Sequence, residues 1–235
     1  MPQLRAVVFD LDGTLVDSAP DLLAAANLLL ESLGRRQLGL TEIKAMIGDG
    51  TTRLVERALA ATGAVPADSK LHVERFLAAY EAEATRLTQP YPGVLPTLQH
   101  LAEDGIRLAV CTNKPLKATT AVLGGLGLDR FFSAVVGGDS LAVRKPDPRV
   151  LLEALARLET APNQAVMVGD NEHDVATARA AGVPMILVSY GYARLPVAEL
   201  GADRLLHRFD ALPAALAEIA GGPPPRLDRR RRRPL

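Results

Sequence analysis

The sequence predicts an α/β fold in which a doubly wound parallel sheet carries an inserted helical domain. Short apolar runs recur along the chain and stop abruptly at polar residues or glycine. Helical patterns alternate with the later runs, and a long stretch separates the first run from the second. Short runs without polar alternation are typical of strands buried on both faces, and alternation with helices indicates a parallel sheet with crossover helices.

The predicted strands and crossover helices follow from these runs. The runs predicted as strands are Ala6–Phe9, Leu108–Cys111, Ala134–Val136, Ala165–Val168 and Met185–Val188. Helical periodicity between the later runs predicts helices over Pro148–Leu158 and Glu172–Ala181.

The stretch after the first strand is longer than a usual crossover connection, so it must hold an insertion. Apolar residues recur at helical spacing in Asp21–Leu33 and Lys70–Leu87, and Thr41 and either Thr51 or Thr52 are candidate helix caps. Two prolines and a glycine within Gln89–Gly93 indicate an extended return linker. The predicted domains are therefore a helical domain over residues 17–87 and an α/β core over residues 1–16 and 88–220.

The composition is that of a globular protein. Of the 235 residues, 48% are hydrophobic and 23% are charged, which suits one core with a modest insertion. Cys111 is the single cysteine, so a disulfide within the chain and a cysteine-based zinc site are excluded, and a cytoplasmic location is expected. No apolar run approaches the roughly 20 residues of a membrane helix, and the run before Asp10 is too brief for a secretory signal.

The charge is unevenly distributed although the formal net charge is zero. Arg226 and Arg229–Arg233 stand against one acid, Asp228, and a Gly-Pro stretch precedes them. Residues 221–235 are therefore predicted to be a disordered basic tail, and a solvated appendage is favoured over a segment that binds nucleic acid or anionic lipid. The rest of the chain is mildly acidic, so function is expected to require no nucleic acid and no membrane.

Polar residues follow the predicted strands at the sheet edge where such folds bind ligands. Asp10 and Asp12 follow the first strand at a tight glycine turn, and Thr112 and Asn113 follow the second strand. One carboxylate can attack a substrate while the other manages a proton, and the hydroxyl and amide can hydrogen-bond an anion. The sequence therefore predicts an anion site with carboxylate chemistry.

The later strand ends add a cation and two further acids. Lys145 stands just ahead of a proline-initiated helix, and Asp170 and Asp174 follow the fourth strand. Hard oxygen ligands of this kind suit Mg²⁺, which accepts one or two carboxylates together with substrate phosphate. Each pattern alone is more typical of turns, caps and helix starts, so only their joint order favours a site.

In this order the motifs resemble those of the haloacid dehalogenase superfamily. The first motif of that superfamily, Asp-x-Asp-x-Thr, is matched by Asp10, Asp12 and Thr14, the strand-terminal threonine by Thr112, the lysine by Lys145, and the final Gly-Asp with a second acid by Gly169, Asp170 and Asp174. The resemblance spans about residues 4 to 219. It implies a Rossmann-like core with a helical cap inserted after the first motif.

The resemblance also implies a role for each matched residue. Asp10 is expected to be the nucleophile that takes the phosphoryl group, and Asp12 the general acid that later activates water. The expected Mg²⁺ ligands are the Asp10 carboxylate, the Asp12 backbone carbonyl and Asp170, with Asp174 supporting the ion from outside. The residues expected to bind phosphoryl oxygens are Thr112, Asn113 and Lys145.

Further matches indicate which branch of the superfamily the chain resembles. Haloacid dehalogenases lack the acid at Asp12 and phosphonate hydrolases commonly carry alanine there, so both are disfavoured. Phe9–Pro20, Thr112–Pro115 and Gly137–Asp139 are similar to phosphoglycolate phosphatases, which implies 2-phosphoglycolate as the small phosphorylated substrate. A phosphatase of another small metabolite such as a sugar phosphate, or a phosphomutase, stays open, whereas the intact motifs disfavour a binding protein without turnover.

The loop before a helix of the inserted domain is expected to meet the substrate carboxylate. Gly48 and Gly50 can present backbone N–H groups there, and Arg53 can add charge, although an interhelical turn with Arg53 in solvent is the alternative. His173, within the final motif, is interpreted as a loop residue because histidine is a poor magnesium ligand. Cys111, at a strand end, is interpreted as a small core residue.

Overall fold

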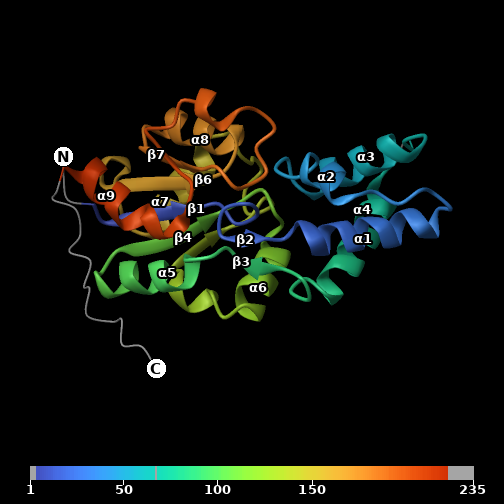
Figure 1. Cartoon of the computed structure of the whole chain (residues 1–235), viewed down its shortest axis with the longest axis horizontal. Coiled ribbons are helices and arrows are strands. Elements are labelled where there is room, and N and C mark those ends of the chain that lie inside the picture. Colours follow the sequence, from blue (N-terminus) through green and yellow to red (C-terminus); the bar gives the residue numbers. More distant parts are fainter. Residues whose placement is uncertain (1–3, 67, 222–235) are drawn as a thin grey trace.

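A computed structural model of the chain describes residues 4–66 and 68–221. Within that part of the chain, parallel strands form a six-stranded sheet in the order β5-β4-β1-β6-β7-β8 (Figure 1). The strands are β1 (Ala6–Phe9), β4 (Arg107–Cys111), β5 (Ala134–Val136), β6 (Ala165–Gly169), β7 (Met185–Val188) and β8 (Arg204–Leu206). The predicted parallel sheet is confirmed. All but Gly221 of the predicted basic tail lies outside the described residues.

Helices cover both faces of this sheet, as a doubly wound fold requires. Val7 and Phe9 of β1 enter the core beneath α5 (Val94–Glu103), α6 (Leu116–Gly125) and α9 (Leu212–Ala220). Ala6 and Val8 enter the opposite core, beneath α7 (Arg149–Arg157) and α8 (Glu172–Ala181). All four β1 side chains are fully buried, which explains why this strand is apolar without alternation. Short 3₁₀ turns complete the core at Asp129–Phe131, Pro162–Gln164, Val197–Glu199 and Phe209–Ala211.

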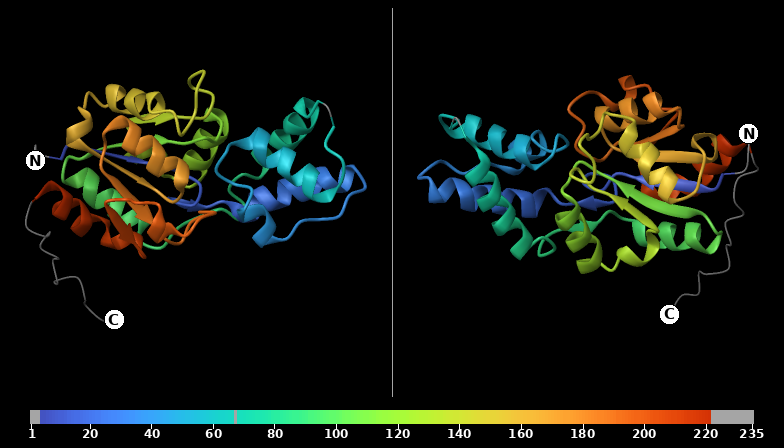
Figure 2. Two further views of the ribbon diagram at one scale, coloured as in Figure 1. Left: turned by 90° about the horizontal axis from the view of Figure 1, so that it is seen from above. Right: turned by 180° about the vertical axis from the view of Figure 1, so that it is seen from behind.

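The long connection between β1 and β4 contains a group of helices that lies apart from the sheet (Figures 1 and 2). These helices are α1 (Ala19–Ser32), α2 (Leu40–Lys44), α3 (Thr51–Thr62) and α4 (Lys70–Ala82). Helix α1 packs against the other three, and one stripe of α3, which contains Leu54 and Ala58, is buried. We refer to residues 17–87 below as the helical insertion.

Two adjacent chain segments join the helical insertion to the sheet. Strand β2 (Val16–Asp17) pairs antiparallel with β3 (Gln89–Pro90), so the predicted return linker is in part a strand. The buried Asp21 carboxylate accepts hydrogen bonds from the backbone N–H groups of Leu87 and Thr88 and from the Thr88 hydroxyl. The start and the end of the insertion are therefore fastened to each other.

Some predicted helix ends are wrong. Helix α2 begins after Gly39, whose N–H donates to the Glu42 side chain, and α3 begins after Gly50, so Thr41 and the two threonines 51 and 52 lie inside helices and do not cap them. Helix α4 stops at Ala82 and does not reach Leu87. At Leu87 and Thr88 the backbone N–H groups bind Asp21 and so make no helical hydrogen bonds.

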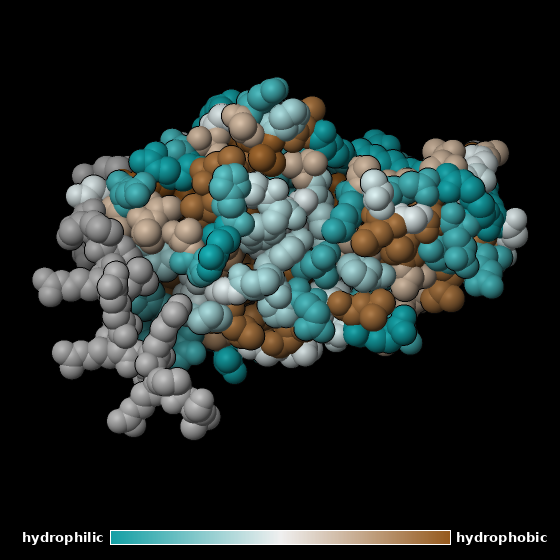
Figure 3. Space-filling view, in the orientation of Figure 1, coloured by the Kyte–Doolittle hydropathy of each residue, from teal (hydrophilic) through white to brown (hydrophobic). Residues whose placement is uncertain are grey.

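Hydrophobic and hydrophilic side chains are interspersed on the face of the molecule drawn in Figure 3. Exposed large hydrophobic residues are spread over the insertion and the core: Leu28, Leu40, Val65, Leu71, Leu87, Leu95, Leu152 and Leu195. Among the helices that the structure describes, none combines the length and the apolar character needed to span a bilayer.

Candidate active site

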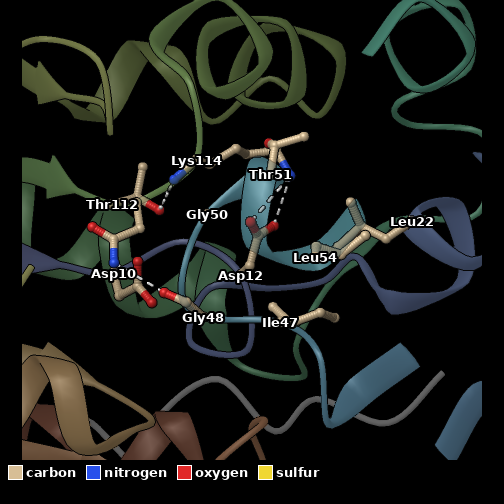
Figure 4. Close-up of a pocket in the computed structure, with 11 residues that line it drawn as sticks. Asp10, Asp12, Leu22, Ile47, Gly48, Gly50, Thr51, Leu54, Thr112 and Lys114 are labelled. Atoms are coloured by element: carbon tan, nitrogen blue, oxygen red, sulfur yellow. Dashed lines mark hydrogen bonds and ion pairs between the residues drawn. The ribbon is translucent and has the colours of Figure 1, made fainter. Parts of the chain in front are cut away.

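Predicted site residues from the core and from the helical insertion meet in a pocket at the carboxyl ends of the strands, where the insertion faces the sheet (Figure 4). The core contributes Asp10, Asp12, Thr112, Asn113 and Lys114 to the pocket, and the insertion contributes Leu22, Ile47, Gly48, Gly50, Thr51 and Leu54. The free space between them is only about 40 Å³, which holds a few water molecules. The structure therefore has the insertion closed over the strand ends.

A buried cluster of carboxylates surrounds one lysine beneath this pocket. Lys145 Nζ lies 2.8 Å from Asp10 Oδ1 and 2.6 Å from Asp174 Oδ1. Carboxylate oxygens of Asp10, Asp170 and Asp174 all lie within 4.8 Å of one another. Strands β1 and β6 are neighbours in the sheet, and Asp10 and Asp170 directly follow them, which is why residues so far apart in sequence converge.

The charge balance of this cluster is unfavourable. Burial raises the pKa of Asp10 to about 6, because the stabilising charge of Lys145 does not offset the loss of hydration and the repulsion by Asp174. Burial also raises the pKa of Asp170 well above its ordinary value, with further repulsion from Asp174 and Asp10. The site therefore contains more buried negative charge than Lys145 neutralises.

Glycines enclose the two acids that follow β6. A Cβ atom at Gly13 would lie 2.3 Å from Asp170 Oδ2, and one at Gly191 would lie 2.3 Å from Asp170 Cβ. Asp170 Oδ2 also accepts a hydrogen bond of 2.5 Å from the Tyr192 N–H, and its Oδ1 accepts one of 3.4 Å from the Thr14 hydroxyl. Asp174 is similarly fixed, because its Oδ2 accepts from the N–H groups of Asp170 and Asn171.

Asp12 lies at the pocket wall, away from this cluster. Its Oδ1 accepts a hydrogen bond of 2.6 Å from the Ser18 hydroxyl, and Lys114 Nζ lies 3.1 and 3.0 Å from its two oxygens. Burial lowers the pKa of Lys114, but the neighbouring Asp12 charge outweighs this effect and leaves the pKa raised. Lys114 is thus a permanently charged partner of Asp12, and sequence analysis did not include it among the site residues.

Thr112 and Asn113, the two predicted phosphate donors after β4, differ in their surroundings. Thr112 lines the pocket, and its hydroxyl accepts a hydrogen bond of 3.3 Å from the Lys114 N–H. The Asn113 amide donates to the carbonyls of Gly48 and Lys145 and accepts from the Lys145 N–H. These hydrogen bonds tie the insertion to the loop that carries Lys145, and the role of Asn113 in binding phosphate stays a prediction.

Of the residues predicted to meet the substrate carboxylate, some line the pocket and one does not. Gly48 and Gly50 lie in the pocket wall, both with positive φ angles, of 113° and 87°. Arg53 does not reach the pocket: its side chain is 67% exposed and pairs with Glu56 at 2.7 Å. The buried stripe of α3 includes Leu54 and Ala58, and this helical phase is the sequence signal that turns Arg53 outward.

A group of charged contacts fastens the insertion to the core outside the pocket. Asp49 pairs with Arg57 of α3, with Arg194 of the core and with His173 at the start of α8. Burial raises the pKa of Asp49, but hydrogen bonds from Arg194 and Arg57 outweigh this and hold it well below its usual range. The interpretation of His173 as a loop residue is wrong, because His173 lies in the first turn of α8 and its Nε2 is 2.5 Å from Asp49.

Comparison with known proteins agrees with this geometry. Residues 7–188 match the family model described as haloacid dehalogenase-like hydrolase. The chain belongs to this family. It is 47% identical over 231 residues to a phosphoglycolate phosphatase of Rhodospirillum rubrum, covering 96% of this chain and 94% of the relative. It is 42% identical over 212 residues to a phosphoglycolate phosphatase of Caulobacter vibrioides, covering 89% of each chain.

Solved structures of the haloacid dehalogenase-like family have the same fold. A crystal structure described as a predicted phosphoglycolate phosphatase from Haemophilus somnus superposes with a TM-score of 0.85 at 32% identity, covering 90% of this chain and 97% of that one. CbbY from Rhodobacter sphaeroides, solved in complex with phosphate, superposes with a TM-score of 0.78 at 26% identity, covering 89% and 96%. The predicted membership and fold are both confirmed.

The carboxylate cluster of this family member fits a divalent cation. Asp10, Asp170 and Asp174 offer oxygen atoms close enough to share one ion. Asp10 Oδ1 is buried and accepts no hydrogen bond from the described residues, although Lys145 lies at ion-pair distance. Hard oxygen donors with an excess of buried negative charge suit Mg²⁺ or a similar ion.

Proposed function

We propose that this chain is a Mg²⁺-dependent phosphatase that converts 2-phosphoglycolate to glycolate and phosphate. The observation that carries the proposal is the buried carboxylate cluster, with Asp10 facing the closed pocket and Lys145 behind it. The choice of substrate is supported by the phosphoglycolate phosphatases to which the chain is similar over almost its whole length.

In the proposed reaction Asp10 is the nucleophile. One Asp10 oxygen bonds to phosphorus while the bond from phosphorus to the glycolate oxygen breaks, and Asp12 donates a proton to that oxygen. Water then attacks the phosphorus, Asp12 takes a proton from the water, and the bond between phosphorus and Asp10 breaks. Asp12 suits this proton transfer because it lines the same pocket as Asp10 and is held by Ser18 and Lys114.

Thr112 and Lys145 are proposed to hold the phosphoryl oxygens. The Thr112 hydroxyl lines the pocket beside Asp10, and Lys145 Nζ already contacts Asp10. Mg²⁺, when bound by the Asp10 carboxylate, the Asp12 carbonyl and Asp170, supplies positive charge that offsets the phosphate and the surrounding acids. Asp174 supports this site by fixing the backbone of Asp170 and the ammonium of Lys145.

The helical insertion, residues 17–87, is proposed to act as a cap domain over a core of residues 1–16 and 88–220. In the closed state the pocket holds only a few water molecules, so the insertion has to move away for a phosphomonoester to enter. Gly48 and Gly50, in the loop before α3, line the same pocket as Asp10. We place the reaction in the cytoplasm, in line with the single buried cysteine.

The experiment that tests this proposal is phosphate release from 2-phosphoglycolate beside a panel of sugar and nucleoside phosphates. We expect phosphoglycolate to have the highest kcat/KM, and activity to disappear with a chelator and in Asp10→Asn. Activity that survives Asp10→Asn would refute the assignment of Asp10 as the nucleophile. Preference for a sugar phosphate, or transfer of phosphate between sugar positions, would be consistent with the proposed role of Asp10 and would refute 2-phosphoglycolate as the substrate.

A further inference from the structure

Lys114 is a buried cation in the wall of the pocket. Its side chain is 4% exposed, and its ammonium contacts both oxygens of Asp12. Of the described residues that line the pocket, Lys114 alone carries a positive charge. We propose that Lys114 binds the carboxylate of the substrate and thereby determines specificity, an inference that rests on the proposed phosphoglycolate phosphatase function.

The ammonium of Lys114 is held in place from the helical insertion as well as from the core. Its Nζ lies 4.4 Å from the ring centroid of Tyr80, which belongs to α4. The Tyr80 ring is in turn stacked on Phe76, with a centroid distance of 6.2 Å and an interplanar angle of 1°. A cation between a carboxylate and an aromatic face is positioned before a ligand arrives, so little side-chain entropy is lost on binding.

The hydrogen bonds of the Lys114 ammonium go to Asp12, and its remaining contact is with the Tyr80 side chain. An ammonium has three N–H groups, and the two oxygens of Asp12 are its hydrogen-bond acceptors among the described residues. The pocket already contains the carboxylates of Asp10 and Asp12, so a further carboxylate needs a cation at its own end of the substrate. Lys114 supplies that charge beside Asp12, whereas Lys145 lies with Asp10 and Asp174.

The position of Lys114 also fits a short substrate with two anionic ends. Thr112 and Lys114 are two residues apart at the end of β4, and both line the pocket beside Asp10 and Asp12. A molecule with its phosphoryl group at Asp10 and Thr112 therefore needs only a short carbon chain to place a carboxylate at Lys114. Arg53, the cation expected from sequence to do this, pairs with Glu56 on the exposed side of α3.

The test compares 2-phosphoglycolate with ethyl phosphate, which has a methyl group in place of the carboxylate. In Lys114→Met we expect the ratio of kcat/KM for phosphoglycolate to kcat/KM for ethyl phosphate to fall by about 100-fold or more, as for loss of a buried charge pair. Any disturbance of Asp12 lowers both reactions together and cancels in the ratio. Lys117→Met is the matched control, because it removes a lysine whose side chain is 80% exposed, and its ratio should stay unchanged.

Each outcome decides between distinct conclusions. A wild-type preference for phosphoglycolate that Lys114→Met retains would overturn the role of Lys114 and leave the proposed function intact. Equal wild-type rates for the two substrates would overturn the proposed function and the carboxylate site together. Residual hydrolysis of ethyl phosphate shows that Lys114→Met is folded; if that variant does not fold, Lys114→Gln, which keeps a donor to Asp12, should show the same loss of preference.

Discussion

Mg²⁺ should stabilise the protein strongly near neutral pH and hardly at all near pH 5. The reason is the buried carboxylate cluster, where the pKa of Asp10 is raised from 3.8 to about 6 and that of Asp170 is raised as well. Below pH 6 protons occupy these carboxylates and compete with the metal, so the affinity for Mg²⁺ falls as the pH falls.

The sign and size of this effect follow from linkage. Asp10 and Asp170 bind more protons in the metal-free folded state than in the unfolded state between pH 4 and 6, so their contribution to stability falls as the pH rises through that window. For Asp10 alone, the rise of the pKa from 3.8 to about 6 corresponds to about 3 kcal/mol. At neutral pH, Mg²⁺ at about 100 times its Kd contributes about 2.7 kcal/mol, which raises the Tm of a chain of this size by about 5–10 °C.

Thermal unfolding followed by circular dichroism measures this directly, with MgCl₂ or EDTA at pH 7.5 and pH 5 and with ionic strength held constant. Asp170→Asn should abolish the Mg²⁺-dependent rise in Tm, whereas Asp129→Asn, at an exposed position of the core, should retain it. An equal rise in Tm with MgCl₂ at both pH values would refute the reasoning.

Three further substitutions test other features of the site and its supports. Asp49→Asn removes the negative charge that Arg57, Arg194 and His173 share. Because this loosens the closed state, the KM for phosphoglycolate should rise about threefold to tenfold. The control is Glu56→Gln, in the exposed pair with Arg53, which should leave the KM unchanged. Gly191→Ala should abolish the Mg²⁺-dependent rise in Tm, because its Cβ would lie 2.3 Å from Asp170; Gly124→Ala, with open space around it, should keep it. Asp21→Ala should lower the free energy of unfolding in urea by about 2–4 kcal/mol, because it leaves the buried N–H groups of Leu87 and Thr88 without an acceptor. A loss below about 0.5 kcal/mol would show that water replaces those hydrogen bonds.

The sheet could be predicted where burial on both faces left an unbroken apolar run. Strands β1, β6 and β7 are of this kind, and all their residues are buried. Strand β8 was not predicted because Arg204 and Leu205 are exposed or half-buried and the strand has only three residues. The β2-β3 pair was missed for a related reason, since two-residue strands carry no periodic signal.

The acidic residues of the site could be predicted because they come after strands, and parallel strands bring their carboxyl ends to one edge of the sheet. The contacts of Asn113 with Gly48, of Lys114 with Asp12 and of Asp49 with His173 could not be predicted, because the partners are about 65 or more residues apart in sequence. Whether a polar side chain at a strand end faces a ligand or another backbone depends on how the insertion packs on the core, and no local pattern encodes that packing.

The pairing of β2 with β3 makes the helical insertion topologically removable. Val16 and Pro90 are paired residues of antiparallel strands, so their Cα atoms are about 5 Å apart, a gap that a tight turn closes. An ancestral or engineered chain could therefore gain, lose or exchange everything between them without altering the order of the strands. Because Asp10, Lys145 and Asp170 lie on the other side of that junction, the carboxylate cluster keeps its place in the sheet when the insertion is exchanged.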